Sequence, residues 1–157
     1  LEIGTGRGYM ALTLAHKGFK LTTIDSDSKI QRSARDILKH YRVEKLVRFK
    51  CMDAECINFK DDSFDYVLAV NFIHHAKNPI RCLSEMARVA KEKILIVDVN
   101  KRGAYILEKV HAKDGHKHER SKISFPRIRE FLWKAGMKVR TYRSSCQTTI
   151  VASKGEI

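Results

Sequence analysis

The chain has 157 residues, of which 43% are hydrophobic and 31% charged, and its formal net charge is +13. This length suits one domain with a buried core, and the hydrophobic share excludes a mainly disordered chain. No apolar run approaches the roughly 20 residues that span a bilayer, and no charged-then-apolar leader opens the chain. We therefore expect a cytoplasmic protein without a membrane partner. The four cysteines form no C-x-x-C pair and are expected to be reduced thiols: Cys51, Cys56, Cys82 and Cys146.

Glycines at alternate positions follow the first apolar residues. Leu1–Ile3 is typical of the end of a buried strand, Gly4, Gly6 and Gly8 follow, and an amphipathic helix begins at Tyr9. Such glycines let the backbone approach a ligand closely, and the helix N-terminus adds unpaired N–H groups. This predicts a cofactor site, with a glycine turn that binds nothing as the alternative. Tyr9 stands where the dinucleotide fingerprint needs glycine, which disfavours a nicotinamide-dependent oxidoreductase.

The predicted strands and helices alternate from the start of the chain. Only three residues precede Gly4, whereas strands usually have five or six, so we expect further sequence before Leu1. Gly18 predicts the end of the first helix, and a second strand over 19–24 ends at Asp25. Ser26 or Ser28 is predicted to cap the next helix. Its predicted inward face is Ile30, Ala34, Ile37, Leu38 and Tyr41.

Three further strands, predicted over 46–51, 64–70 and 93–99, are rich in apolar residues. Asn78 and Pro79 predict a helix start between the last two, because asparagine caps and proline suits the first helical position. The predicted inward face of that helix is Ile80, Leu83, Met86, Ala87 and Ala90. Strands alternating with helices in this way predict a parallel sheet that is covered on both faces.

The last third of the chain has a different pattern. We predict a helix over 104–110, a polar loop over 111–121, and a helix that Ser124 or Phe125 opens with Pro126. The inward residues and the stop of that helix are predicted to be Ile128, Phe131, Leu132, Ala135 and Gly136. Strands over 138–142 and 148–152 are too close for a parallel crossover and must be antiparallel. The predicted fold is α/β, a doubly wound, mostly parallel seven-stranded sheet ending in an antiparallel hairpin.

Several landmarks lie at the ends of the predicted strands. Glu2 and the glycines form an acidic-x-G-x-G-x-G turn, and Asp25 closes the second strand 17 residues after Gly8. The run Met-Asp-Ala-Glu-Cys-Ile-Asn-Phe-Lys-Asp-Asp-Ser-Phe-Asp over 52–65 follows the third strand, and Val-Asn-Phe-Ile-His-His over 70–75 follows the fourth. Together these landmarks resemble the class I S-adenosylmethionine-dependent methyltransferases, which have similar segments after the same strands. The resemblance extends over the whole chain.

The resemblance implies S-adenosylmethionine as the cofactor and gives roles to individual residues. Asp25 would accept from the ribose hydroxyls, and Asp53 from the adenine amino group beside the Ala54 N–H. A helix-capping acid and a turn residue are the alternatives for the two aspartates. Glu2 and the glycines would meet the methionine tail. The cofactor residues implied are Glu2, Gly4, Thr5, Gly6, Gly8, Asp25, Ser26, Asp53, Ala54 and Asn71.

Asn71, His74 and His75 lie where the methyl group of such a cofactor would point. A histidine there can take a proton near neutral pH, which makes these three the candidate catalytic residues. The alternative is that the histidines only pack and hydrogen-bond. No metal is expected. His111, His116 and His118 lack a cysteine partner and stand among lysines that repel a cation, and they suit contact with an anionic substrate better.

The positive charge is concentrated over 101–143, where 13 Lys and Arg residues face 4 acidic ones. Such an excess favours an anionic partner, RNA or a phosphorylated small molecule, and a charge-rich solvated surface is the alternative. We interpret 1–157 as one domain, with 1–100 binding the cofactor and 101–157 on the acceptor side. The leading hypothesis is methyl transfer by in-line displacement to a small-molecule or RNA acceptor. An RNA-directed enzyme specifically, or a non-catalytic cofactor-binding protein of the same fold, remain alternatives.

Overall fold

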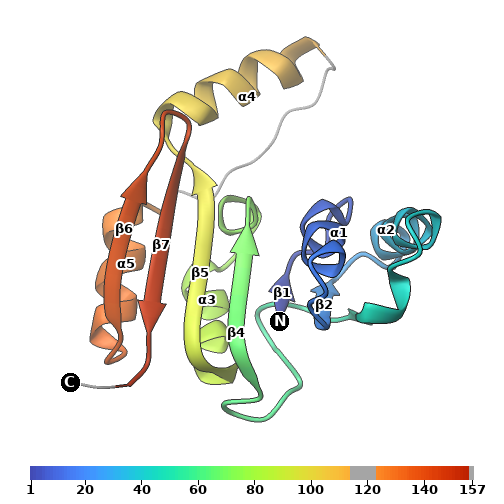
Figure 1. Cartoon of the computed structure of the whole chain (residues 1–157). Coiled ribbons are helices and arrows are strands. Elements are labelled where there is room, and N and C mark those ends of the chain that lie inside the picture. Colours follow the sequence, from blue (N-terminus) through green and yellow to red (C-terminus); the bar gives the residue numbers. More distant parts are fainter. Residues whose placement is uncertain (114–122, 156–157) are drawn as a thin grey trace.

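The computed structural model describes residues 1–113 and 123–155, with the side chains of 110–113 left out. In this part of the chain a seven-stranded sheet has the order β3-β2-β1-β4-β5-β7-β6 (Figure 1). The strands are β1 (Glu2–Ile3), β2 (Leu21–Asp25), β3 (Val47–Cys51), β4 (Phe64–Val70), β5 (Ala90–Val99), β6 (Lys138–Arg143) and β7 (Gln147–Ser153). The pairs among β1 to β5 are parallel, and β7 is antiparallel to both β5 and β6. The predicted fold class is confirmed, including the terminal hairpin.

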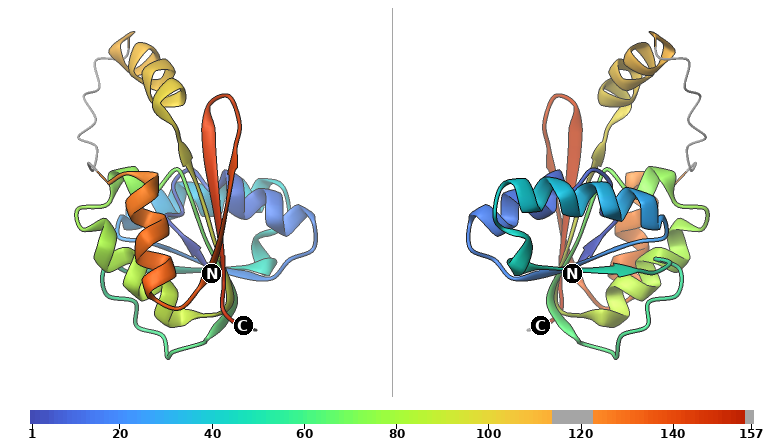
Figure 2. Two further views of the ribbon diagram at one scale, coloured as in Figure 1. Left: turned by 90° about the vertical axis from the view of Figure 1, so that its left-hand side faces the viewer. Right: turned by 90° about the vertical axis from the view of Figure 1, so that its right-hand side faces the viewer.

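Four of the five helices of the described residues cover the two faces of the sheet, two on each face (Figure 2). The five helices are α1 (Tyr9–His16), α2 (Ser28–His40), α3 (Pro79–Val89), α4 (Lys101–Lys113) and α5 (Phe125–Lys134), with 3-10 turns η1 (Glu44–Leu46) and η2 (Ile73–His75). Figure 2 shows α1 and α2 on one face and α3 and α5 on the other. Helix α4 instead follows β5 at the carboxyl edge of the sheet and stands away from it (Figure 1).

The main core lies between the sheet and the α3–α5 pair. Alternate residues of β5 and β7 face it, because side chains of a strand alternate between faces, and Ile94, Ile96 and Ile150 are completely buried. Leu83 of α3 and Leu132 of α5 pack there without exposure. This packed layer holds the carboxyl ends of the central strands in place. The loops at that edge carry the polar residues that line the candidate site.

The start of α2 corrects one prediction. The cap is Asp27, not Ser26 or Ser28, and its Oδ1 accepts from the backbone N–H groups of Lys29 at 2.7 Å and Ile30 at 3.2 Å. One carboxylate oxygen thereby satisfies two of the unpaired donors of the first turn.

The inward face of α2 also differs from the predicted one. Gln31, Ala34 and Leu38 are buried, whereas Ile30 and Tyr41 are exposed and Ile37 is half-buried. The helix presents a polar residue to the sheet because Gln31 pairs with buried oxygens there. Apolar spacing alone does not reveal this.

Other differences concern boundaries. Helix α4 begins at Lys101 and continues through the first three residues of the predicted loop, and the remaining 114–121 lie outside the described residues. β2 starts at Leu21, which leaves Phe19 exposed. Ala135 is the exposed C-cap of α5, and Ala90 already belongs to β5. Fraying and caps move element ends by one or two residues without changing the topology.

Candidate functional site

The glycine turn after β1 forms the floor of a cleft. Gly4, Gly6 and Gly8 have φ values of +82°, +49° and +78°, a region that side chains with a Cβ rarely adopt. A Cβ on Gly4 would lie 2.6 Å from the ring of Phe72, and one on Gly8 would lie 2.9 Å from the Cβ of Ala34. Gly8 therefore serves the packing of α1 on α2 and does not line the cleft, unlike the other two glycines.

Two carboxylates stand beside this turn at the ends of β2 and β3. Asp25 accepts from the backbone N–H groups of Gly6 at 3.1 Å and Asp27 at 3.0 Å, one on each oxygen. Asp53 accepts from the N–H of Glu55 at 2.8 Å. A carboxylate has about four acceptor positions, so both side chains retain capacity for ligand donors. Each is thus fixed by its own loop and still able to bind.

The carboxylate of Glu2, the first residue of β1, is 2% exposed. Burial raises its pKa from 4.5 to about 7; a hydrogen bond from Thr23 opposes the rise, and the charge of Asp25 adds to it. Its Oε2 is buried without a hydrogen-bond partner among the described residues. An unpaired buried carboxylate is unfavourable, so Glu2 is suited to a ligand that brings a positive charge into the cleft.

A buried polar cluster supports the turn from below. The hydroxyls of Thr5 and Thr23 lie 2.8 Å apart, and the amide nitrogen of Gln31 donates to Thr5 Oγ1 at 3.2 Å and to the carbonyl oxygen of Lys50 at 2.8 Å. The Thr5 side chain is therefore occupied in positioning the turn. Gln31 was missed by the sequence analysis, because a polar residue in a helix usually indicates the solvent face.

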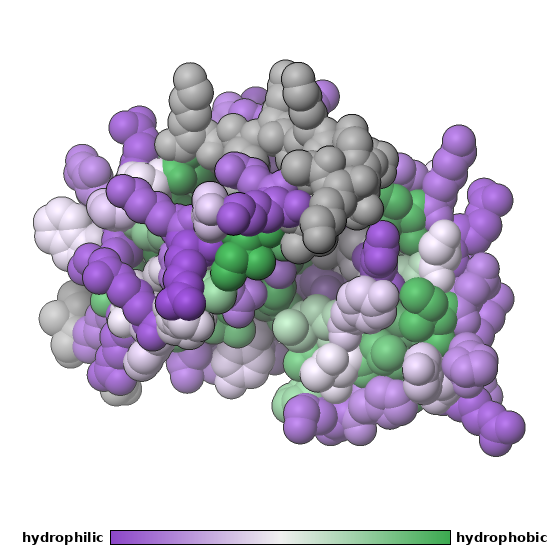
Figure 3. Space-filling model, turned by 90° about the horizontal axis from the view of Figure 1, so that it is seen from above, coloured by the Kyte–Doolittle hydropathy of each residue, from purple (hydrophilic) through white to green (hydrophobic). Residues whose placement is uncertain are grey.

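Two adjoining hollows make up the cleft and share Gly4, Asp25, Ser26, Phe72 and His75. One extends to the Asp53–Ala54 side and the other to the side of Glu2, Thr5, Gly6 and Asn71. The structure thus brings together all the predicted cofactor residues except Gly8. Apolar lining that the sequence analysis missed comes from Tyr9, Met10, Ile30, Met52 and Phe72. Seen from above, hydrophobic surface lies toward the middle of this edge and hydrophilic side chains surround it (Figure 3).

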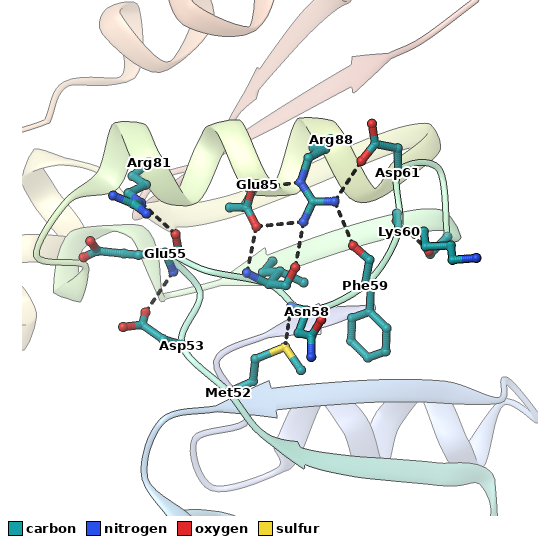
Figure 4. A network of polar contacts seen from close by, with 12 residues as sticks. Met52, Asp53, Glu55, Asn58, Phe59, Lys60, Asp61, Arg81, Glu85 and Arg88 are labelled. Carbon is teal, nitrogen blue, oxygen red and sulfur yellow. Dashed lines mark hydrogen bonds and ion pairs between the residues drawn. The ribbon is translucent and has the colours of Figure 1, made fainter.

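The loop that carries Asp53 is fastened to α3 by two arginines, Arg81 and Arg88 (Figure 4); Arg81 donates to the Glu55 carbonyl oxygen at 2.9 Å. Arg88 donates to the carbonyl oxygens of Ile57 and Phe59, both at 2.7 Å, and forms a two-pronged ion pair with Glu85 at 2.8 and 2.9 Å. Glu85 in turn accepts from the N–H of Ile57, and its hydrogen bond from Arg88 lowers its pKa. The planar guanidinium matches this set of acceptors, as an ammonium would not.

The three candidate catalytic residues lie on the segment after β4, and they do not all line the cleft. Asn71 has a φ of +51°, donates its N–H to the Val97 carbonyl at 2.7 Å, and lines the cleft. His75 lines the cleft as well. His74 lines a separate hollow, and its Nδ1 lies 2.5 Å from Oδ1 of Asp98. The two histidine rings touch, with centroids 3.9 Å apart.

Within the described residues no three His, Cys, Asp or Glu side chains are grouped as metal ligands. The side chains of His111, His116 and His118 lie outside that part of the chain. None of the helices, as far as they are described, has the length and apolar character needed to cross a bilayer.

Comparison with known proteins places this cleft in context. Residues 1–97 match the family model of the methyltransferase domain. A phosphatidylethanolamine N-methyltransferase of Cereibacter sphaeroides is 33% identical over 100 residues, which cover 64% of this chain and 49% of that protein. The uncharacterized methyltransferase YcgJ of Bacillus subtilis is 32% identical over 100 residues, which cover 62% and 39%. The chain spans about half or less of the length of these curated relatives.

Solved structures show the same fold. The crystal structure of the Bacillus YcgJ protein has a TM-score of 0.78 at 19% identity and covers 99% of this chain and 91% of its own. Magnesium protoporphyrin IX methyltransferase from Synechocystis, solved with bound SAH, has a TM-score of 0.78 at 18% identity, covering 98% and 73%.

Proposed function

The chain belongs to the class I S-adenosylmethionine-dependent methyltransferases, and on this premise we propose that the protein transfers a methyl group from S-adenosylmethionine to an acceptor by in-line displacement. The family uses this cofactor. One feature of the cleft carries the proposal for this chain. Glu2 is a buried carboxylate with an unpartnered oxygen, beside glycines that admit a ligand closely, and S-adenosylmethionine brings an ammonium group.

The residues of the cleft fit the parts of this cofactor. We assign the ribose hydroxyls to Asp25, the adenine amino group to Asp53 with the Ala54 N–H facing the ring, and the ammonium to Glu2. The first two carboxylates retain free acceptor positions beside their loop hydrogen bonds. Ser26 and the shared apolar lining complete the cleft.

When bound, S-adenosylmethionine supplies a methyl group on a sulfonium, which is already a good leaving group. The protein therefore needs chiefly to align the acceptor and exclude water. Asn71 and His75 border the cleft at its junction with the end of β5, where an acceptor would approach. We propose that residues 1–100 hold the cofactor and that 101–157 form the acceptor side. The alternatives of RNA specificity and of a non-catalytic role gain no support from the cleft.

Calorimetric titration with S-adenosylmethionine, S-adenosylhomocysteine and NAD tests the proposal. We expect binding of the first two and not of NAD. Asp25→Ala should weaken binding by about 2 kcal/mol, roughly thirtyfold, because it removes an ionised acceptor of two hydrogen bonds. Asp36→Asn, on the exposed face of α2, is the matched control and should bind normally. Binding of NAD alone, or equal affinities for Asp25→Ala and the parent protein, would overturn the assignment.

A further inference from the structure

The hollow that His74 lines lies beside the cleft and is built by other elements. Its walls come from the end of β5, the start of α4, the start of α5 and the turn between β6 and β7. Apolar lining is provided by Val99, Ile123, Phe125 and Pro126. Hydrophobic lining of this kind suits the body of a small organic molecule.

The walls of this hollow are fastened together. Asn100 donates its amide N–H groups to the carbonyl oxygens of Ser144 at 3.1 Å and Ser145 at 3.3 Å, and it accepts from the N–H of Gly103 at 3.0 Å. A Cβ on Gly103 would lie 2.1 Å from the Cys146 carbonyl oxygen, so α4 and the turn meet as closely as glycine permits. The walls of the hollow are therefore held in place by hydrogen bonds and by a close contact between α4 and the β6–β7 turn.

The charged side chains in the described lining of the hollow are cations. They are Lys101, Arg102 and Arg143, none of which is ion-paired within residues 1–113 and 123–155, and no acidic side chain of those residues is part of the lining. Unopposed cations at the rim of an apolar hollow attract an anion and repel a cationic ligand.

His74 enters the hollow with a fixed orientation. Both oxygens of Asp98 accept backbone N–H groups, Oδ2 from His74 at 3.0 Å and Oδ1 from Val99 at 2.8 Å. Oδ1 also contacts Nδ1 of His74, which places Nδ1 as the donor, so that in the neutral imidazole Nε2 carries the lone pair. Asp98 is 4% exposed, so the carboxylate serves the imidazole and not the solvent.

His75 connects the hollow to the cofactor cleft. Its ring touches that of His74, while it lines the cleft where we assign S-adenosylmethionine. An acceptor in the hollow would thus lie against a histidine one ring away from the cofactor. A general base has to reach the proton of the attacking atom, and the base candidate is the histidine on the acceptor side.

We infer that the hollow beside the His74–Asp98 pair is the acceptor site, that it takes a small anionic molecule with an apolar body and a hydroxyl nucleophile, and that His74 is the general base. Asp98 acts through His74 as a positioning residue. The inference rests on the proposed function and names the substrate class for it.

The acceptor hydroxyl gives its proton to Nε2 of His74 as its oxygen bonds to the methyl carbon, and the electrons of the broken carbon–sulfur bond stay on sulfur. A hydroxyl is favoured over an amine as the nucleophile, because the three rim cations would repel an ammonium group. A hydroxyl needs a general base near neutral pH, and the His74–Asp98 pair can supply one.

The first test measures binding and needs no turnover. With the protein saturated by S-adenosylhomocysteine, 4-hydroxybenzoate and its uncharged analogue 4-hydroxybenzamide are titrated while the imidazole nitrogens are followed by 15N NMR. We expect the carboxylate to bind about tenfold more tightly and to shift the His74 resonances. Arg143→Gln should largely abolish that preference, whereas Arg140→Gln, exposed on the same strand outside the hollow, should keep it. Equal affinities, no binding, or binding without a change at His74 would overturn the inference.

The second test separates a base from a structural residue by its pH profile. For methyl transfer to 4-hydroxybenzoate, His74→Gln should lower kcat near neutral pH by about 100-fold or more, and the gap should narrow as the pH approaches the phenol pKa of about 10. Asp98→Asn should lower kcat with the KM for the probe retained. A loss that is equal at every pH, with weakened probe binding, would show a structural role only.

The two proposals fail in different ways. If S-adenosylhomocysteine itself does not bind, the proposed function is wrong. If it binds and 4-hydroxybenzoate neither binds nor is methylated, the cofactor assignment stands and the acceptor assignment is wrong.

Discussion

Protonation of Glu2 should control cofactor affinity near neutral pH. A rise of its pKa from 4.5 to about 7 corresponds to about 3 kcal/mol of unfavourable free energy for the ionised form in the folded protein. The stabilising contribution of Glu2 is present below pH 4.5 and is lost as the pH rises through about 7. A bound ammonium group reverses this cost, because it pairs with the ionised carboxylate. Binding should therefore release a proton and strengthen as the pH rises.

The expected size follows from the ionised fraction. With a pKa of about 7, the ionised share of Glu2 falls about eightfold between pH 7.5 and pH 6.0, and the dissociation constant should rise by the same factor. The α-amino group of the cofactor titrates near pH 8 and stays mostly protonated over this range. Calorimetry at four or five pH values, in buffers of different ionisation enthalpy, measures both the affinity and the protons released.

Glu2→Gln separates this cause from others. The amide keeps the shape and loses the charge, so affinity at pH 7.5 should fall about tenfold and the dependence between pH 6.0 and 7.5 should vanish. Asp36→Asn should retain the parent profile. A flat profile in the parent protein would refute the reasoning. If the slope persists in Glu2→Gln, a group of the cleft other than Glu2 is responsible.

Three further substitutions test how the site is built. Arg88→Ala should destabilise the protein by about 2 kcal/mol and weaken S-adenosylhomocysteine binding, because the carbonyl oxygens of Ile57 and Phe59 lose their donor. In thermal melts, Arg88→Lys should recover only part of the lost stability. An unchanged Tm in Arg88→Ala would contradict this. Gly4→Ala and Gly18→Ala both strain a positive φ by about 1 kcal/mol. Only Gly4→Ala should also reduce cofactor affinity in calorimetry, since its methyl group meets an aromatic ring of the cleft; equal losses would argue otherwise. Gly103→Ala should lower both the denaturation midpoint and the preference for 4-hydroxybenzoate over 4-hydroxybenzamide, because the added methyl group displaces Cys146. An unchanged preference would show that the position of α4 does not affect binding in the hollow.

The strands and the glycine turn were predictable because their signals are local. Near-continuous apolar runs predict strands buried on both faces, and the φ values of Gly4 and Gly6 follow from their being glycines in a tight turn. The aspartates at strand ends were predictable for a topological reason. Carboxyl ends of parallel strands meet at one edge, so Asp25 and Asp53 had to lie close together.

What the sequence did not reveal depends on contacts between distant segments. Gln31 faces inward because it satisfies the hydroxyl of Thr5 and a carbonyl of β3, a partnership that periodicity does not record. His74 and His75 are adjacent, yet they line different hollows. They belong to a 3-10 turn, in which successive side chains are about 120° apart, so the assignment of each histidine required the structure.

The balance of lining charges differs between the two sites in a way that suits the proposed chemistry. In the cleft, Glu2, Asp25, Asp53 and Glu55 outnumber Arg7 and Lys77, whereas Lys101, Arg102 and Arg143 line the hollow beyond β5. A cationic methyl donor and an anionic acceptor would each meet the opposite charge on their own side. The excess of basic residues over 101–143 then has a specific use, and it disfavours a cationic acceptor more than any single residue does. In the proposed transfer, the sulfonium would lose its positive charge and the hydroxyl would lose its proton to His74.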